Sequence, residues 1–238
     1  MKTRLIWAFA IIAIGFAPFT PLTLTANAED LTEQFDKKHK ACLERIAVDN
    51  ELAYEEALIW RSQGGGRRAK HCVAMSLFAL GQPDEAAFKL DKLAKASDGG
   101  TPSMRADFYF EATNFWLDAN NPERAYQSAT DGLKLKYDHE ELRISRARAY
   151  AKVGRYDYAQ TDLTSVLTLS PNRVDALRYR ADAHLNQGNL TDAKRDIERA
   201  LNLDPSIIET AVLRGRINEA IRKAALSKAN APTTPEPK

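Results

Sequence analysis

Residues of matching type recur at a spacing of 34 positions in the C-terminal half of this 238-residue chain. Gly154 and Gly188 stand at this spacing. It also separates Tyr156 from Leu190, Ala159 from Ala193, Leu167 from Leu201, Leu169 from Leu203, and Pro171 from Pro205. A period of this length is typical of helix–turn–helix units stacked in a row, because one such unit cannot bury its apolar face alone. The spacing therefore predicts an all-α chain built as an array of helix pairs.

Each unit carries a pattern of small and large residues that indicates two closely packed antiparallel helices. Small residues let the two helices approach, and they recur at Ala147, Ala159, Ala181, Ala193 and Ala200. Larger residues fill the space between the helices, at Tyr150, Tyr156, Leu163, Leu190 and Ile197. Gly154 and Gly188 follow the first helix of each unit, where a left-handed cap is favoured. Pro171 and Pro205 end the second helix.

This pattern resembles the tetratricopeptide repeat, a family of helix-pair units of 34 residues. The resemblance implies a right-handed superhelical solenoid of antiparallel helix pairs. It covers four units, at residues 67–98, 106–139, 140–173 and 174–205. The first two units match less closely, and Asn120 stands where glycine caps the helix elsewhere. Lys70, Arg143 and Arg180 occupy positions that are usually apolar, which leaves the curvature of the solenoid open.

The segments on either side of the array are expected to close its ends. Residues 29–66 carry two helical patterns, the first of them short, and are interpreted as a degenerate N-terminal repeat. Residues 206–227 form one amphipathic pattern, which predicts a capping helix that shields the last unit from water. Residues 228–238 are polar and proline-rich, a composition that predicts a disordered tail.

The N-terminus has the three parts of a secretory signal peptide. Lys2 and Arg4 are basic, residues 5–19 form an apolar run, and Ala26 to Ala28 is a small-x-small cleavage site. Cleavage after Ala28 would remove residues 1–28 and send the chain to the periplasm, with no integral membrane segment left. The alternative is an uncleaved N-terminal anchor, although the apolar run is shorter than the roughly 20 residues that span a bilayer.

Cleavage would leave a chain without a net charge. The whole sequence has 34 Lys and Arg against 32 Asp and Glu, and the signal peptide holds two of the basic residues and none of the acidic ones. A balanced charge argues against a general polyanion binder, because phosphate backbones are bound by an excess of Lys and Arg. No nucleic-acid partner is therefore expected.

Cys42 and Cys72 are the only cysteines of the chain. Exported proteins meet an oxidising compartment, in which two thiols usually pair. A structural disulfide closing this loop would stabilise the fold by about 3–4 kcal/mol in the chain-entropy model. The alternatives are two buried free thiols or a redox pair, and the latter usually has the CxxC spacing that is missing here.

The stretch WRSQGGGRRAKHC, residues 60–72, separates the N-terminal cap from the first unit. Its glycines predict a helix C-cap followed by a flexible turn. The spacing does not fit a phosphate-binding GxxxxGK[ST] loop. The alternative is an anion site, formed by helix N-terminal amides beside Arg67, Arg68 and Lys70. In the family geometry His71 faces the groove, and Cys72 links its helix to the one that carries Cys42.

The sequence contains no catalytic motif. No GxSxG, HExxH or dinucleotide-binding fingerprint is present. The four histidines are scattered without the spacing of metal ligands, at His39, His71, His139 and His184. His184 falls where the family packs an aromatic residue, which predicts a core histidine. No enzymatic activity, cofactor or metal is therefore expected.

The resemblance also implies which residues face the concave surface, where some family members hold a peptide's terminal carboxylate with Lys, Asn and Arg. The candidate partner-binding residues are Phe110, Asn114, Arg148, Lys152, Arg178 and Tyr179. Glu111, Asp175 and Asp182 lie among them and would repel a carboxylate. The alternative is that these charged groups form salt bridges between neighbouring helices.

These features favour an exported scaffold that binds a protein or peptide partner of the cell envelope on its concave face. A second hypothesis is an architectural subunit that assembles through its convex face or its caps. A third is an accessory subunit of an envelope enzyme or assembly complex. The sequence alone does not choose among them, and it leaves the oligomeric state and the pathway open.

Overall fold

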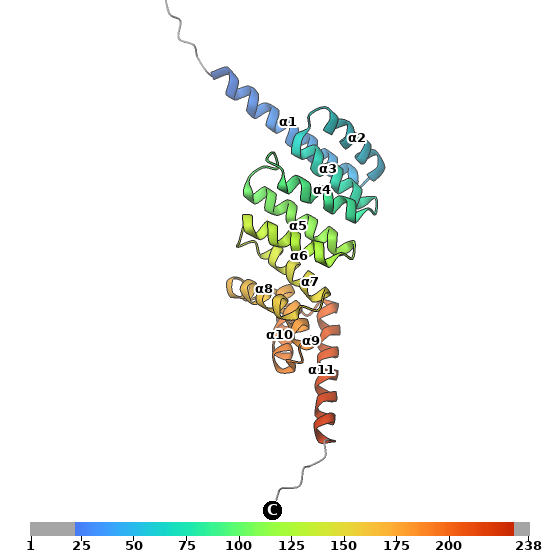
Figure 1. The fold of residues 1–238 in the computed structure, drawn as a ribbon, viewed down its shortest axis with the longest axis vertical. Coiled ribbons are helices and arrows are strands. Elements are labelled where there is room, and N and C mark those ends of the chain that lie inside the picture. The colour runs from blue at the N-terminus through green and yellow to red at the C-terminus, as the bar shows by residue number, and fades with distance from the viewer. Residues whose placement is uncertain (1–21, 231–238) are drawn as a thin grey trace, which may run out of the picture.

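The computed structural model describes the backbone of residues 22–230 and the side chains from Asp30 to Asn230. Throughout this part the chain is helical and contains no strand. The helices stack into an elongated array, with α1 at one end and α11 at the other (Figure 1). They are α1 (Leu22–Ile46), α2 (Asn50–Ser62), α3 (Gly66–Ala79), α4 (Pro83–Lys95), α5 (Pro102–Asp118), α6 (Pro122–Leu135), α7 (Glu140–Lys152), α8 (Tyr156–Leu169), α9 (Val174–Asn186), α10 (Leu190–Leu203) and α11 (Ile208–Ala229).

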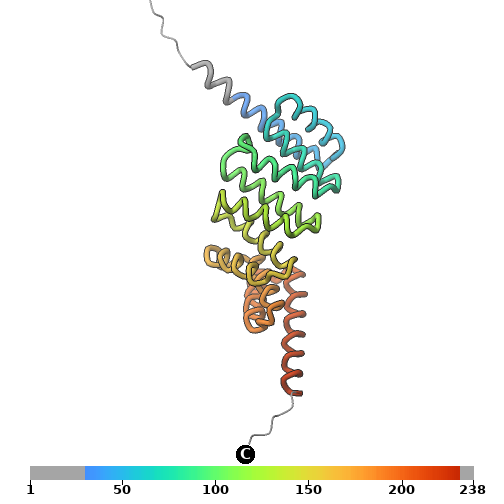
Figure 2. Tube along the Cα trace, in the orientation of Figure 1, coloured from blue at the N-terminus to red at the C-terminus, as the bar shows by residue number. Residues whose placement is uncertain are grey.

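The helices form two rows, and each row is a separate face of the array. Odd-numbered helices pack against one another as well as against their even-numbered neighbours: α1 lies on α3, α5 on α7, α7 on α9, and α9 on α11. The even-numbered helices pack chiefly against the odd-numbered ones on either side of them. The trace in Figure 2 shows the chain passing back and forth between the rows. We call the odd-numbered row the inner row and the even-numbered row the outer row.

The four predicted units correspond to the antiparallel pairs α3 and α4, α5 and α6, α7 and α8, α9 and α10, but α5 begins at Pro102, four residues before its predicted unit. Gly154 and Gly188 have φ values of 75° and 79°, so both adopt the left-handed conformation predicted for the cap. Asn120 has φ 54° and is the only residue other than glycine with a positive φ in the described chain. Asparagine tolerates this conformation better than other side chains, and Asn120 therefore performs the role that glycine performs in the later units.

The predicted small residues form the contact between the helices of each pair. Ala147, Ala159, Ala181, Ala193 and Ala200 are all almost completely buried. Gly132 in α6 is tighter still, because a Cβ added there would lie 2.8 Å from a Leu142 methyl carbon and from the Tyr109 Cβ. Of the larger residues, Leu163 and Ile197 are buried, while Tyr150, Tyr156 and Leu190 are partly exposed.

Two expectations about the ends of the array were wrong. The first helix was expected to be short, but α1 is the longest helix described, with 25 residues. Ion pairs one turn apart support it, such as Lys37 with Glu33 and Lys40 with Glu44. The capping helix α11 ends at Ala229 rather than at 227, so residues 228 and 229 belong to it and not to the tail.

Part of the predicted signal peptide and part of the predicted tail, residues 1–21 and 231–238, lie outside the described residues. The predicted cleavage position after Ala28 falls within α1. Among the helices from α1 to α11, none is long and apolar enough to cross a membrane.

The glycine run makes a tight turn from α2 to α3. Gly64 and Gly66 have φ values of 86° and 58°, which favour glycine. Gly65 is buried, and a Cβ on it would lie 2.6 Å from Trp60 Nε1 and from Ala69 Cβ. The turn is therefore closely packed at Gly65, whereas Gly64 and Gly66 are exposed and supply the left-handed backbone conformation.

This turn directs α3 so that its cysteine meets α1. Cys42 in α1 and Cys72 in α3 are joined by a disulfide, and their Cα atoms are 6.4 Å apart. Two of the basic side chains that follow the glycines pair with carboxylates: Arg68 binds Asp36 of α1, and Lys70 binds Asp98. The disulfide and the Arg68–Asp36 pair attach α1 to the first unit of the array, whereas the Lys70–Asp98 pair lies within that unit.

Candidate partner-binding site

A hollow of about 150 Å³ lies on the inner row where α5, α7 and α9 meet. Four of the six candidate residues line it: Phe110, Asn114, Arg148 and Tyr179. Arg178 lies next to Tyr179 and lines a neighbouring hollow between α9 and α11. Lys152 is exposed near the end of α7 and lines neither hollow. The structure thus brings five of the six candidates to one region and leaves Lys152 outside it.

Asn114 holds Arg148 in place across two successive repeats. The Asn114 side-chain N–H donates to the Phe110 carbonyl one turn earlier in α5, at 2.9 Å. Its oxygen therefore faces α7, where it accepts hydrogen bonds from Arg148 Nη1 at 2.9 Å and from Ser145 Oγ at 3.2 Å. Because its partner is an uncharged amide, the Arg148 guanidinium is oriented without being neutralised.

Two guanidinium groups flank the ring of Tyr179. The centre of the Arg178 guanidinium lies 4.4 Å from the ring centroid, and that of Arg148 lies 5.8 Å from it. Within the described part of the chain, neither group is within 4.0 Å of a carboxylate. The Nε of Arg178 is buried and has no hydrogen-bond partner among the described groups. The site therefore presents two positive charges and an unused donor beside an aromatic ring.

The three carboxylates that were expected to repel a ligand here contact basic groups, whereas Glu209, which lines the hollow beside Arg178, has no basic partner within 4.0 Å among the described residues. Glu111 contacts His71 at 2.7 Å, Asp175 binds Arg173 at 2.8 Å, and Asp182 binds Arg216 at 3.1 Å. The salt bridge to Asp175 raises the pKa of Arg173 above its usual range. The alternative of salt bridges between neighbouring helices therefore applies to these three acidic residues. Arg148 and Arg178, in contrast, have no carboxylate partner among the described residues.

A polar cluster that the sequence analysis missed recurs between the repeats. Arg146 of α7 donates two hydrogen bonds of 2.7 Å to the buried Asp162 of α8, and a third to Thr130 of α6. In the next unit the same three contacts join Arg180 to Asp196 and Thr164. Each arginine connects its own helix pair to the preceding unit, so the cluster sets the packing of one repeat on another.

The 34-residue spacing held the signal for this cluster. The arginines, the aspartates and the threonines of the two clusters are each 34 positions apart. Arg180 was identified only as a departure from an apolar position. Its physical explanation is the almost fully buried Asp196, whose charge requires a partner inside the protein.

Two of the four histidines, although far apart in the sequence, meet in the structure. His39 of α1 and His71 of α3 share a hydrogen bond of 2.9 Å, and the other nitrogen of His71 lies 2.7 Å from Glu111 of α5. The chain of contacts connects three helices of the inner row. Burial, followed by the charges of His71 and Arg68, lowers the pKa of His39 to about 4.

His71 lies on the inner row, as the family geometry implied, and its ring is buried between α1 and α5. In the tautomer whose proton is on Nε2, His71 donates to Glu111, and its Nδ1 accepts from His39. No three His, Cys, Asp or Glu side chains in the described chain are placed to hold a metal ion. His184 is buried beside Asp196, as predicted for a core histidine.

A comparison with protein families matches residues 144–206 to the tetratricopeptide repeat. This segment contains most of α7 and all of α8, α9 and α10. Human RNA polymerase II-associated protein 3 is 34% identical over 155 residues, which cover 64% of this chain and 23% of that protein. A DnaJ homolog subfamily C member 7 homolog of Dictyostelium discoideum is 36% identical over 111 residues, covering 45% of this chain and 20% of the relative. The matches span about a fifth to a quarter of these relatives.

Solved structures of low sequence identity share the fold. YrrB, described as a tetratricopeptide repeat protein, superposes with a TM-score of 0.57 at 15% identity, covering 80% of this chain and 88% of its own. MamA of Desulfovibrio magneticus gives 0.54 at 16% identity, covering 70% and 97%. The family match identifies residues 144–206 as tetratricopeptide repeats, and the helix pairs from α3 to α10, with their left-handed caps, share this fold.

Proposed function

We propose that this protein is a scaffold that binds an extended peptide of a partner protein on its inner row. The observation that carries the proposal is the pair of arginines beside Tyr179 that have no carboxylate partner among the described residues. Arg148 is already oriented by Asn114, so binding needs little reordering of this side chain. A carboxylate of the peptide, at its C-terminus or on an acidic side chain, would supply the missing partner.

The ring of Tyr179 supports the same role. An aromatic face next to two cations offers an apolar surface on which the peptide can rest while its carboxylate meets the guanidinium groups. Phe110 adds a second ring at the edge of the same hollow. Hydrogen bonds to charged groups contribute about 1.5–3 kcal/mol each, so the two arginines are expected to dominate recognition.

The experiment uses a pool of random octapeptides attached through their N-termini, one half with free C-terminal carboxylates and the other half amidated. We expect the wild-type protein to select peptides from the free-carboxylate half, or acidic peptides from both halves. The variant Arg148→Gln, Arg178→Gln should lose this selection while keeping its helical circular dichroism and melting temperature, because neither arginine forms an ion pair with a described carboxylate that the substitution would break.

The matched control is Arg195→Gln, Arg199→Gln, which removes two charges from exposed positions on α10 of the outer row. It should select peptides like the wild type. Unchanged selection by the Arg148 and Arg178 variant, accompanied by a large loss of melting temperature, would mean that these arginines hold the repeats together. The architectural role would then replace the peptide-binding one.

We also propose that the protein is exported to the periplasm after cleavage behind Ala28. The basic, apolar and small-residue segments of the N-terminus support this proposal, and a disulfide between Cys42 and Cys72 suits an oxidising compartment. Mass spectrometry of the protein purified from its native envelope fraction should find Glu29 as the first residue. A retained Met1 would instead indicate an N-terminal anchor.

A further inference from the structure

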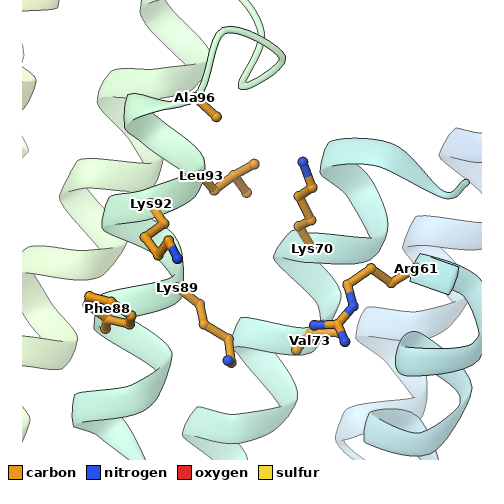
Figure 3. A pocket seen from close by; sticks show the side chains of 8 residues that line it. All are labelled: Arg61, Lys70, Val73, Phe88, Lys89, Lys92, Leu93 and Ala96. Atoms are coloured by element: carbon orange, nitrogen blue, oxygen red, sulfur yellow. The ribbon is translucent and has the colours of Figure 1, made fainter.

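A second hollow, of about 350 Å³, opens on the other side of the array between α2, α3 and α4. Figure 3 shows that the side chains lining it come from three helices. Arg61 belongs to α2, Lys70 to α3, and Phe88, Lys89 and Lys92 to α4. This hollow belongs to the outer row, away from Arg148 and Tyr179. Neither the repeat packing nor the proposed peptide site uses it.

The lining of this hollow is basic, with four cations and no acidic residue. Lys70 and Lys89 pair with Asp98 and Glu85, which are themselves well exposed outside the hollow. Such exposed pairs are weak and exchange readily for another anion. Arg61 and Lys92 have no carboxylate within 4.0 Å among the described residues. The hollow therefore attracts negative charge.

An exposed aromatic ring stands among these cations. The side chain of Phe88 is 45% exposed, and the Lys92 ammonium lies 5.4 Å from its ring centroid. Leu93 contributes a further apolar surface inside the hollow. A ligand suited to these groups has negative charges together with an apolar side chain that covers the Phe88 ring.

A third hollow, of about 260 Å³, continues the surface toward α6 and shares Phe88 and Lys92 with the second. Its basic side chains are Lys92, Lys95 and Arg124. The carboxylate of Asp91 accepts hydrogen bonds from Trp116 and Ser128, which are uncharged and leave its charge in place. Asp131, the other acidic residue, binds Lys134. Together the two hollows are lined by six basic and two acidic side chains, so they form one elongated surface that is basic on balance, with Phe88 and Lys92 as the ridge between them.

We propose that this outer surface docks an acidic segment of a partner protein, with one aromatic or aliphatic side chain placed against Phe88. Its elongated form suits a stretch of polypeptide that crosses the ridge, since a compact small molecule would occupy one hollow only. The cations line recesses, which suits a chain that enters them better than a flat lipid surface. The protein then has two recognition surfaces, one on each row, and this one does not depend on Arg148 and Arg178.

The probe is a fluorescein-labelled acidic nonapeptide, made of glutamate and aspartate with one central phenylalanine, and binding is followed by fluorescence anisotropy. We expect Arg61→Gln, Lys92→Gln to weaken its affinity about tenfold, as the loss of two ion pairs implies. Added salt should weaken binding in the wild type more than in this variant. Phe88→Ser should lower the affinity for this peptide to the value that the wild-type protein shows for a peptide with serine in place of phenylalanine.

Two controls separate this surface from the inner row. All variants are measured in an Arg148→Gln, Arg178→Gln background, because the inner row is itself proposed to bind acidic peptides. In this background Arg195→Gln, Arg199→Gln should leave the affinity for the acidic peptide unchanged. Unchanged affinity after Arg61→Gln, Lys92→Gln is added to the background would overturn the proposal, and so would the absence of peptide binding in the background protein itself. Vesicles of phosphatidylglycerol and phosphatidylcholine provide the last comparison. If sedimentation with these vesicles depends on Arg61 and Lys92 while peptide binding does not, the surface binds lipid and the proposal is overturned.

Discussion

The two ends of the array are closed by different means. At the N-terminal end none of the α1 side chains from Asp30 onward is fully buried, and α1 is held by the Cys42–Cys72 disulfide and the His39–His71 hydrogen bond. At the C-terminal end α11 buries Leu213 and Ile217 against the last unit. An end helix has neighbours on one side alone. It therefore needs either an apolar face or a cross-link to stay attached.

The largest effect is expected from breaking the cross-link. In the chain-entropy model a disulfide that closes a loop of this length contributes about 3–4 kcal/mol. Reduction should therefore release α1, because few buried contacts hold it. Hydrogen exchange should show loss of amide protection in α1, with α7 to α10 protected as before.

The double variant Cys42→Ser, Cys72→Ser provides the control for the reductant and should behave like the reduced protein. If the amides of α1 stay as protected as in the oxidised protein, packing and histidine contacts suffice to hold the helix, and the contrast between the ends disappears.

A somewhat smaller effect is expected from the charged cluster near the C-terminal end. Arg180→Leu leaves the buried carboxylate of Asp196 without its two short hydrogen bonds. An unsatisfied buried charged group costs about 2–3 kcal/mol, so chemical denaturation should show a decrease of this size in the free energy of unfolding. Lys194→Leu is the control, since it removes an exposed partner of Glu198 and should cost less than about 0.5 kcal/mol. Similar values for the two variants would mean that the cluster does not hold the repeats.

Overpacking tests the contact inside the last helix pair. Ala193 is fully buried, so Ala193→Leu should destabilise the protein by about 1–3 kcal/mol. The melting temperature of Ala193→Leu is compared with that of Arg195→Leu, which changes a side chain that is 63% exposed in the wild type. Equal shifts in melting temperature would contradict the assignment of Ala193 to the helix contact.

The smallest effect is a pH dependence at the N-terminal end. The pKa of His39 is lowered from 6.5 to about 4, chiefly by burial and then by His71 and Arg68, with Asp36 acting in the opposite direction. Between these pH values the unfolded chain binds a proton that the folded chain does not, so stability falls as the pH drops through this range. Hydrogen exchange of α1 should therefore accelerate from pH 7 to pH 5, after correction for the intrinsic rate.

His39→Gln should reduce this dependence in α1. Burial also lowers the pKa of His184 in α9, so the acid sensitivity of the C-terminal units should remain in the variant. An equal loss of pH dependence at both ends would show that His39 does not act locally.

The sequence predicted the regular part of the fold because its signals are local and repeated. The left-handed caps at Gly154, Gly188 and Asn120 follow from backbone preferences within one turn. Buried alanines such as Ala193 follow from their place in the unit. The length of α1 was missed because its support comes from ion pairs along an exposed helix, which produce no apolar period.

The candidate site was predicted only in part. The resemblance indicated Asn114, Arg148, Arg178 and Tyr179 as neighbours, and the structure places them together. It did not indicate that Arg148 would bind an amide while Arg173 and Arg216 bind the carboxylates. Which of several like charges forms a salt bridge depends on distances of a few ångströms between repeats, and the residue pattern of one repeat does not define these distances.

The sequence by itself determined the helix pairs, their caps and their order, because these depend on interactions within one 34-residue unit. Only the tertiary structure decided which charges remain free, and it also decided that His39 meets His71 and that Phe88 stands in a basic recess. Those properties depend on how one unit is placed on the next, and small displacements there determine whether a charged group meets a partner or remains open to a ligand.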